Sequence, residues 1–339
     1  MIETPAGGDL ADMPPTDPLS QALSLIRLSS AVFLRGEFGA SWAFSSCSAA
    51  ELSRLLGLGA DRAILLHVIT AGACRLTMAS GESTVAHAGD VVMLPYSDDH
   101  TMGDPEGGAP VPVVSLLPPP PWHTMPVLRH GSGPVLTRIM CGYLHCRDLP
   151  FHPLLKALPP LIHVRPSGAA ASWLSATLSY TMDQASQQQP GAATLLARLP
   201  ELLFIDTLRQ YAQREPDLPR SWLAAQRDPI VGRAMVLLHA DPARPWTVSR
   251  LAAEAGVSRS VLADRFKRVL GQSPMRYLAY WRLQVAAHLL ATTNTALARL
   301  AASTGYESEA AFSRAFKRRL GVPPGVWRER NARAPSGPA

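Results

Sequence analysis

The spacing of hydrophobic residues changes along this chain and divides it into two parts. Short apolar runs and period-two alternation predict β-strands in the first part, at residues 64–69, 74–78, 91–94 and 135–143. Apolar residues at three- and four-residue intervals predict helices over residues 173–188 and 194–213, and the helical spacing continues toward the C-terminus. We therefore expect a two-domain α+β protein, with a small β-barrel or sandwich and flanking helices followed by an all-α domain.

One motif occurs twice in the C-terminal part. Leu251–Gly256 (LAAEAG) recurs 49 residues later as Leu300–Gly305 (LAASTG). Phe266-Lys267-Arg268 recurs 50 residues later as Phe316-Lys317-Arg318. A short helix, a glycine able to take positive φ and a second helix that packs on the first make a helix-turn-helix. The repeat therefore predicts two such motifs in tandem.

Capping residues and prolines set the expected limits of these helices. Ser258 is the expected N-cap of a recognition helix that ends at Leu270, and a connecting helix is expected from Pro274 to Thr292. Further helices are expected at residues 230–240, 248–255, 297–304 and 308–320, with a last one beginning at 323–324. The apolar residues on their inner faces are expected in the core: Leu251, Leu262, Phe266, Leu300, Phe312 and Phe316.

The positive charge of the chain is concentrated in this repeated part. Residues 229–339 contain 17 Arg or Lys and 6 Asp or Glu, a net charge of +11 in a chain whose total is +6. Nearly all of this charge is arginine, which binds phosphate oxygens or a guanine edge through paired hydrogen bonds. A GC-rich genome also produces an arginine bias, and both explanations stay open. The charge favours a nucleic-acid partner for the C-terminal domain.

Two helix-turn-helix motifs joined by a helix resemble the DNA-binding domain of the AraC/XylS family of bacterial transcriptional regulators. The resemblance implies a sequence-specific regulator with double-stranded DNA and RNA polymerase as partners. In this family, helices beside the sensor domain often pair two subunits, so a homodimer is expected; a helix that covers only its own barrel is the alternative. Whether the chain activates or represses transcription stays open.

The early, outward positions of each recognition helix are expected to reach base edges. These are Arg259, Ser260, Ala263 and Asp264 on the first helix and Glu309, Ala310 and Arg314 on the second. Lys267, Arg268, Lys317 and Arg318 lie later in the helices and are expected to contact phosphates. For Asp264 and Glu309, an ion pair within the protein is the alternative.

A second motif lies in the N-terminal domain. Gly89, Pro95, Ser97 and His100 keep the spacing of the second cupin motif, with serine at a place where that family prefers glycine. The His-x-His pair of the first cupin motif is missing, and His67 stands alone. The domain is therefore similar to the cupin-like effector domains of AraC-type regulators. With His67 and the Cys141-Gly142-Tyr143 strand, it resembles the branch that senses reactive chlorine species.

Trp42, His67, Cys74, His100 and Cys141 are the candidate residues of a sensor pocket. One interpretation is a metal ion held by His67, His100 and Cys141, although no cofactor is certain. A second is a thiol switch that joins Cys141 to Cys146 or Cys74, for an oxidant effector. A third is a small-molecule pocket lined by His67, His100 and Trp42. The plain alternative is that Cys74 and Cys141 are small apolar core residues.

A competing function for the whole chain is a cupin metalloenzyme, a dioxygenase or isomerase, with an appended DNA-binding domain. The missing metal ligands argue against it, so we expect no enzyme. The expected domains are a disordered N-terminus (1–20), a cupin-like sensor (21–150), a helical dimerisation segment (151–213), a linker (214–228) and the DNA-binding domain (229–335). No signal peptide or bilayer-length apolar stretch is found, and the four cysteines lack C-x-x-C spacing. A soluble cytoplasmic protein without a membrane partner is expected.

Overall fold

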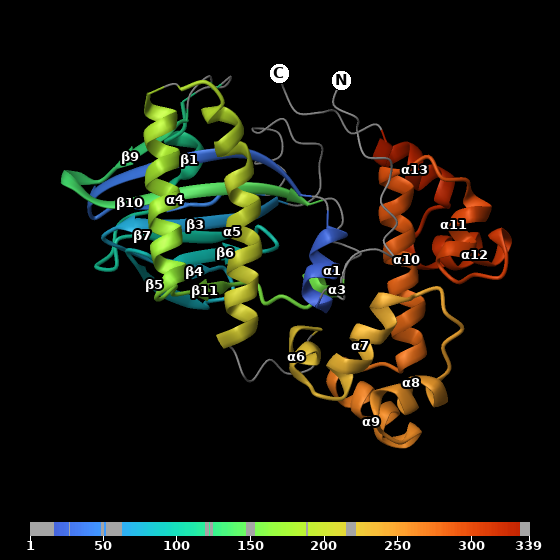
Figure 1. Ribbon diagram of the computed structural model, residues 1–339. Helices are drawn as coiled ribbons and strands as arrows, with labels where there is room; N and C mark the ends of the chain where they lie inside the picture. The colour runs from blue at the N-terminus through green and yellow to red at the C-terminus, as the bar shows by residue number, and fades with distance from the viewer. Residues whose placement is uncertain are drawn as a thin grey trace. The chain divides into compact units, whose positions relative to one another are not determined.

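The computed structural model describes residues 17–26, 28–48, 51, 63–118, 122, 125–146, 153–187, 189–214 and 222–332. These residues form two compact units, drawn in Figure 1. The β unit comprises residues 28–146 and 158–214, and the helical unit comprises residues 17–26, 153–157 and 222–332. The α+β class and the division into a β-rich part and a helical part are confirmed.

The β unit consists of two sheets that face each other. The six-stranded sheet has the order β11-β6-β3-β10-β1-β9, with β11 (Ile162–Val164), β6 (Val91–Leu94), β3 (Ala63–Ala71), β10 (Ser132–Cys146), β1 (Leu28–Ala40) and β9 (Val127–His130). The five-stranded sheet has the order β5-β4-β7-β2-β8, with β5 (Ser83–His87), β4 (Ala73–Met78), β7 (His100–Gly103), β2 (Ala43–Ser45) and β8 (Val111–Pro112). Large apolar side chains fill the space between them, and Trp42 stacks on Phe38 with ring centroids 4.0 Å apart. All four strands expected from the sequence are present.

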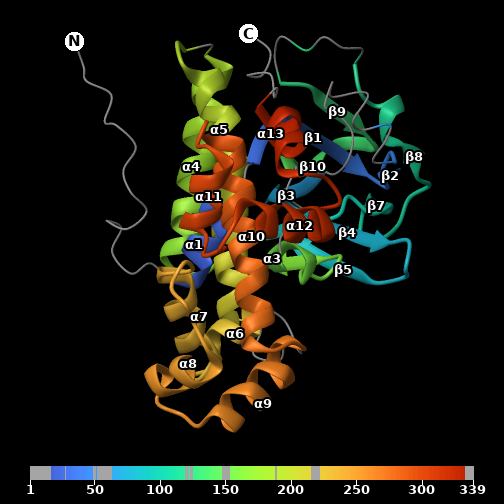
Figure 2. The same ribbon diagram turned by 90° about the vertical axis from the view of Figure 1, so that its right-hand side faces the viewer.

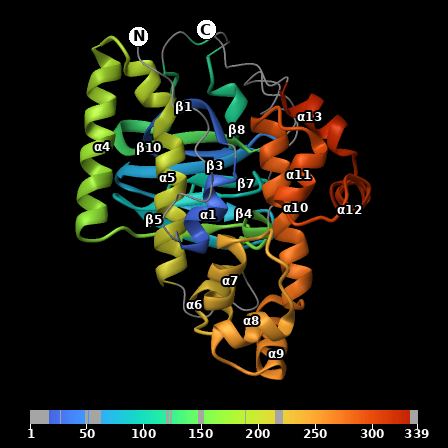
Figure 3. The same cartoon turned by 45° about the vertical axis from the view of Figure 1, so that its right-hand side comes forward.

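Two long helices accompany the six-stranded sheet. α4 (Ala169–Ser186) and α5 (Ala192–Arg214) lie side by side, and α5 packs along β1, β3, β6, β10 and β11 (Figure 3). The expectation that residues 151–213 are entirely helical is wrong at β11. There Ile162 and Val164 are buried and pair with Met93 and Val91 on the edge of the sheet, because three residues of apolar–polar–apolar pattern suit a short edge strand.

The helical unit is built around one long helix, α10 (Pro274–Thr292). Figure 2 shows α8 (Val248–Ala255) and α9 (Arg259–Leu270) near one end of α10, and α11 (Leu297–Ser303), α12 (Glu309–Leu320) and α13 (Pro324–Ala332) near the other. α6 (Trp222–Arg227) and α7 (Val231–Ala240) pack beside α9. The predicted helix limits agree with these to within one residue. The six predicted core residues of the two motifs are all fully buried.

The expected domain limits differ from the two units at three places. Residues 18–20, expected to be disordered, begin α1 (Pro18–Ser24), which Asp17 caps and which packs on α6 and α7. α3 (Pro153–Lys156) also packs on α6, so it belongs to the helical unit. α6 forms within the expected linker, because buried Trp222 anchors it by donating a hydrogen bond to the Tyr277 hydroxyl at 3.0 Å. Residues 1–16 and 215–221 lie outside the described residues.

Candidate functional sites

The turns of the two repeated motifs are closed by the same pair of hydrogen bonds. Gly256 has φ +76° and donates to the Ala253 carbonyl at 3.1 Å, while Val257 donates to Ala252 at 3.0 Å. In the second copy, Gly305 has φ +80° and donates to Ala302 at 3.0 Å, and Tyr306 donates to Ala301 at 2.9 Å. Other residues are strained at such φ values, so the glycine that ends the first helix determines where the chain turns.

A serine begins each second helix. The Ser258 hydroxyl accepts a hydrogen bond from the Val261 amide at 3.3 Å, and the Ser308 hydroxyl accepts one from Ala311 at 3.2 Å. Each serine therefore satisfies an amide that would lack a partner at the helix start. The helices α9 and α12 start at equivalent positions of the repeat as a result.

The expected DNA contacts lie on the outer sides of α9 and α12. Of the eleven residues, ten are exposed and Ala263 is half-buried; the exposed residues are Arg259, Ser260, Asp264, Lys267, Arg268, Glu309, Ala310, Arg314, Lys317 and Arg318. Within the part of the chain that the structure describes, neither Asp264 nor Glu309 forms an ion pair. The alternative of an internal ion pair for these two acids is therefore not observed.

Two residues of α9 were missed by the sequence analysis. Val261 is 45% exposed on the outer side of the helix, so it adds an apolar group beside Arg259 and Ser260. Arg265 instead faces inward and pairs with buried Asp228 at 2.5 Å. Asp228 also accepts hydrogen bonds from the amides of Ile230 and Val231 at the start of α7. Nothing in the sequence signals this pairing, because the two residues are 37 positions apart.

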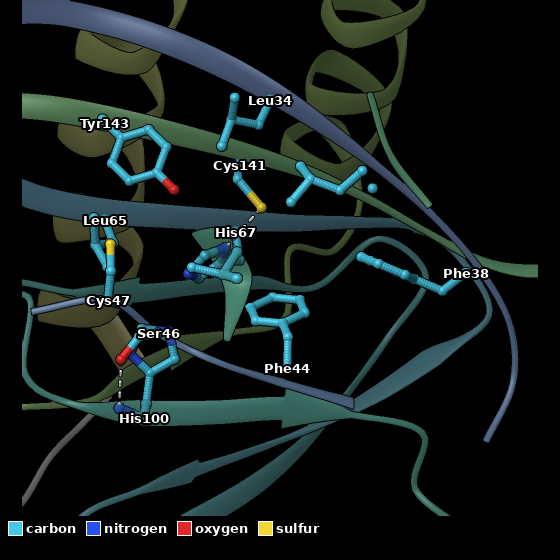
Figure 4. Close-up of a pocket in the computed structure, with 13 residues that line it drawn as sticks. Leu34, Phe38, Phe44, Ser46, Cys47, Leu65, His67, His100, Cys141 and Tyr143 are labelled. Atoms are coloured by element: carbon cyan, nitrogen blue, oxygen red, sulfur yellow. Dashed lines mark hydrogen bonds between the residues drawn. The ribbon is translucent and has the colours of Figure 1, made fainter. Parts of the chain in front are cut away.

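A small cavity lies between the two sheets of the β unit (Figure 4). Its volume of about 30 Å³ is room for about two water molecules. Apolar side chains make up part of the wall, and its polar lining consists of Ser46, Cys47, His67, His100, Cys141 and Tyr143. Among the described residues that line it there is no lysine, arginine or carboxylate, so this part of the wall carries no fixed charge.

Strand register brings His67 and Cys141 together. The two residues are direct partners in the pairing of β3 with β10, and the His67 Nδ1 atom lies 3.0 Å from the Cys141 Sγ atom. His100 comes from the opposite sheet, with its ring centroid 5.8 Å from that of His67. The Nδ1 atom of His100 lies 2.8 Å from the Asp98 carbonyl oxygen. His67 is only 3% exposed, and its Nε2 atom has no hydrogen-bond partner in the part of the chain that the structure describes.

The cupin-like turn orients His100. Gly89 has φ +92°, and Ser97, at the position where cupins prefer glycine, also takes a positive φ of +53°. The Ser97 hydroxyl donates a hydrogen bond to the Ala63 carbonyl, and this bond holds a residue in a conformation that serine seldom adopts. The chain then enters β7 at His100, whose amide donates to the Ser46 hydroxyl at 3.0 Å.

Burial keeps the ionisable groups of the cavity uncharged. It lowers the pKa of His67 to about 3, with the nearby His100 as a smaller cause, and it also lowers the pKa of His100. Burial raises the pKa of the Cys141 thiol, and in the adjacent core it raises that of Cys74 to about 12. The imidazoles are thus neutral and the thiols protonated at neutral pH. The cavity suits an uncharged ligand better than an ion.

The structure brings together three of the five expected pocket residues. His67, His100 and Cys141 line the cavity, whereas Trp42 and Cys74 are buried in the adjacent core and do not line it. The sequence analysis missed three polar lining residues. Tyr143 lies two residues after Cys141 on the same face of its strand, so the period-two alternation could have identified it. Ser46 and Cys47 follow β2, and they reach the cavity only through the pairing of strands that are distant in the sequence.

One of the sequence hypotheses for this site, the Cys141–Cys146 disulfide, is wrong. The metal interpretation gains no support, because no group of three or more His, Cys, Asp or Glu side chains that could hold a metal ion is found among the residues described. A direct Cys141–Cys146 disulfide is excluded because β10 continues through Cys146. Five strand residues separate the two Cα atoms by about 16 Å, against a limit of about 7 Å for a disulfide.

Comparison with known proteins gives matches over both units. A family model described as a cupin matches residues 17–213, and a model described as a helix-turn-helix domain matches residues 251–330. A protein of Streptomyces lividans named as a putative AraC-like transcription regulator is 35% identical over 92% of this chain and 98% of its own length. The transcriptional regulator AlkR of Acinetobacter baylyi is 29% identical over 93% of this chain and 100% of its own length. The RCS-specific transcriptional activator RclR of Escherichia coli is 26% identical over 81% of this chain and 87% of its own length.

The buried state of His67 predicts how stability depends on pH. Unfolding restores an ordinary histidine pKa of about 6.5, so the unfolded chain gains a proton that the folded chain does not bind above pH 3. The free energy of unfolding of the β unit should therefore fall as pH falls below 6.5, by roughly 1–2 kcal/mol between pH 6.5 and 5 from His67 alone. Urea unfolding followed by tryptophan fluorescence at several pH values measures this loss.

His67→Leu should remove most of that pH dependence, because the variant has no proton to gain at this position. His87→Leu is the matched control, since His87 is exposed on β5 of the same unit. An equally steep pH dependence in the His67→Leu variant would contradict the assignment.

Proposed function

The chain belongs to the AraC family of transcriptional regulators with an N-terminal cupin domain, and from this premise we propose how it recognises DNA and its effector. Its relatives are named as transcriptional regulators, so it is a DNA-binding regulator and not the cupin metalloenzyme considered as the alternative. Among the residues described, no helix is long and apolar enough to cross a membrane. The protein acts in the cytoplasm, where its target DNA and RNA polymerase are found.

The outer faces of α9 and α12 read base edges in two successive segments of the major groove. Arg259 and Arg314 donate hydrogen bonds to guanine, Asp264 accepts one from a cytosine amino group, and Ala263 and Ala310 lie against thymine methyl groups. Their exposure and the absence of ion pairs at Asp264 and Glu309 support this assignment. Lys267, Arg268, Lys317 and Arg318, one to two turns later, bind phosphates.

α10 holds both motifs on one helix, so one copy of the domain reads two segments about 34 Å apart on the same side of the duplex. A single copy therefore recognises an asymmetric site. A dimer recognises two such sites.

Arg314→Ala and Lys317→Ala separate base contacts from phosphate contacts on the same helix. We expect Arg314→Ala to lower the preference for one base position by about 1–3 kcal/mol, because a bidentate contact to a base is lost. Lys317→Ala should weaken binding to all duplexes alike and reduce the dependence of log affinity on log salt by about 1, because one fewer counterion is released. Affinities of the full-length protein for a selected duplex and its single-base variants, over a range of salt concentrations, measure both.

Glu329→Ala, on α13 outside both recognition helices, is a control in which a charged residue is removed without loss of a proposed contact. The same pattern of loss for Arg314→Ala and Lys317→Ala would overturn the division into base and phosphate contacts.

The effector is a small uncharged molecule that enters the cavity and reaches His67 and Cys141. The observation that supports this is the unpartnered Nε2 atom of buried His67, since a buried polar atom without a partner costs about 1–3 kcal/mol and a ligand can restore the bond. In either neutral tautomer, Nε2 needs one complementary group. The uncharged wall and the small volume exclude anions and molecules of many atoms unless the sheets move apart.

Such a molecule can be a reversible ligand or a neutral oxidant. Two observations support an oxidant. The Cys141 thiol lies in the cavity wall, and the relative RclR is named as RCS-specific. Against it stands the protonated thiol, which reacts more slowly than a thiolate. The two cases share the same site and differ in whether Cys141 is consumed.

We expect hypochlorous acid to change the affinity of the full-length protein for its selected duplex, and Cys141→Ser to abolish that change while leaving basal binding intact. Cys146→Ser is the matched control, because Cys146 lies on the same strand but does not line the cavity. A Cys141→Ser variant that responds like the parent excludes redox sensing at this residue. Stabilisation by short-chain alcohols or aldehydes, lost in the His67→Leu variant, would then identify a reversible ligand; short-chain carboxylates are the charged control.

The exposed sides of α4 and α5 bind the same helices of a second copy, so that the protein is a dimer. Five large apolar or aromatic residues are exposed on these two neighbouring helices: Trp173, Tyr180, Leu195, Leu202 and Ile205. Exposed apolar residues gathered on one pair of helices favour an interface over a solvated surface. The other side of α5 is already covered by the sheet.

Leu202→Glu should dissociate the dimer, because it places a charge at a residue that is 50% exposed in the monomer and buried in the proposed interface. Sedimentation velocity of the full-length protein measures the oligomeric state. Leu136→Glu is the matched control, since Leu136 is 53% exposed and lies on β10 rather than on α4 or α5. A parent protein that sediments as a monomer at the concentrations at which it binds two sites would rule out this interface.

A further inference from the structure

Arg282 lies near the middle of α10, and its guanidinium group binds three backbone carbonyl oxygens. Its Nε atom donates to Pro242 at 2.7 Å and its Nη2 atom donates to Arg244 at 3.0 Å; both acceptors lie on the loop between α7 and α8. Its Nη1 atom donates to Gly305 at 3.0 Å, in the turn of the second motif. One side chain therefore joins the loop that leads into the first helix-turn-helix to the turn of the second.

The loop bound by Arg282 is itself fixed to the first motif. Arg244 pairs with Glu254 of α8 at 2.7 Å, and its guanidinium lies 4.4 Å from the centroid of the Trp246 ring. The Trp246 indole N–H donates to the Asp241 carbonyl at 2.8 Å. The two contacts of Trp246 keep the loop folded, and the Arg244–Glu254 ion pair joins the folded loop to α8. A shift of the loop relative to α8 would break this ion pair, so the loop and the first motif are expected to move together.

The second motif approaches this loop closely at Gly305. A Cβ atom at residue 305 would lie 2.7 Å from the Arg282 Cζ atom and 2.9 Å from the Ala243 carbonyl oxygen, both too short for any side chain. Gly305 therefore has two roles: it adopts the positive φ of the turn and it leaves space for Arg282. The planar guanidinium presents its donors in fixed directions, which a lysine ammonium cannot reproduce.

We propose that Arg282 is a positioning residue that fixes the two helix-turn-helix motifs relative to each other and so sets the spacing of the two DNA segments read together. Arg282 acts through the loop at 241–246 and the turn at Gly305 and contacts no base in this scheme. The proposal rests on the proposed use of both motifs on one duplex. Without Arg282 the motifs remain attached to α10, but the hydrogen bonds that join them are lost.

The test measures the penalty for a change in DNA spacing. The probes are a duplex selected by the full-length parent protein from a randomised pool and the same duplex with one base pair inserted between the two recognised segments. We expect the insertion to weaken binding of the parent by about tenfold, and that of Arg282→Met by about twofold or less, because uncoupled motifs adapt to the new spacing. Arg282→Lys, which keeps the charge but not the three hydrogen bonds, should behave like Arg282→Met and serves if the methionine variant fails to fold.

Arg276→Met is the matched control, because Arg276 is an exposed arginine on the same helix. It should keep the full insertion penalty even if its charge loss weakens binding to both probes. A spacing penalty in Arg282→Met and Arg282→Lys equal to that of the parent overturns the proposal, whether or not their overall affinity or melting temperature falls. A parent protein that shows no insertion penalty contradicts the joint use of both motifs, and with it both proposals.

Discussion

The left-handed glycine at the end of the first helix of each motif is the constraint on which the helical unit depends. The chain must turn within a few residues there, so that Leu262 and Phe266, or Phe312 and Phe316, reach the core while the opposite side of the same helix stays exposed. A residue with a Cβ at φ near +80° costs about 1 kcal/mol or more, and at Gly305 it would also collide with Arg282. The serine caps and the outward charges act only because these turns first set the helix directions.

In the β unit, the main constraint is the free-energy cost of burying polar groups. Pairing of β3 with β10 sets His67 opposite Cys141, and burial on both sides keeps the imidazole neutral and the thiol protonated. The His67 Nδ1 atom and the Cys141 thiol are neighbours, but the Nε2 atom of His67 has no hydrogen-bond partner among the described residues. The described residues around this cavity carry no charge, which favours the uncharged effector proposed above. The net positive charge of the chain is concentrated instead in residues 229–339.

The two units therefore differ in the chemistry that they offer for recognition. The helical unit presents arginines and lysines on exposed helix faces, where attraction to phosphate is long-ranged and depends on salt. The β unit encloses a few polar atoms among apolar side chains, where a single hydrogen bond is stronger than it would be in water. The apolar residues exposed on α4 and α5 form a further surface of the β unit, the one proposed as the dimer interface.

The sequence alone determined what depends on local conformation and on periodicity. The helix limits in the repeated motifs, the two glycine turns and the serine caps all follow from preferences within a few residues, and the repeat presents each signal twice. The cupin-like spacing likewise pointed to Gly89, Ser97 and His100.

Only the tertiary structure decided which distant residues meet: Arg265 with Asp228, Arg282 with Pro242 and Gly305, and Cys47 with the cavity of His67 and Cys141. The tertiary structure also excluded the Cys141–Cys146 disulfide. It placed Trp42 and Cys74, which were expected in the pocket, in the core. These contacts depend on strand register and helix packing across many residues, and no short-range pattern encodes them.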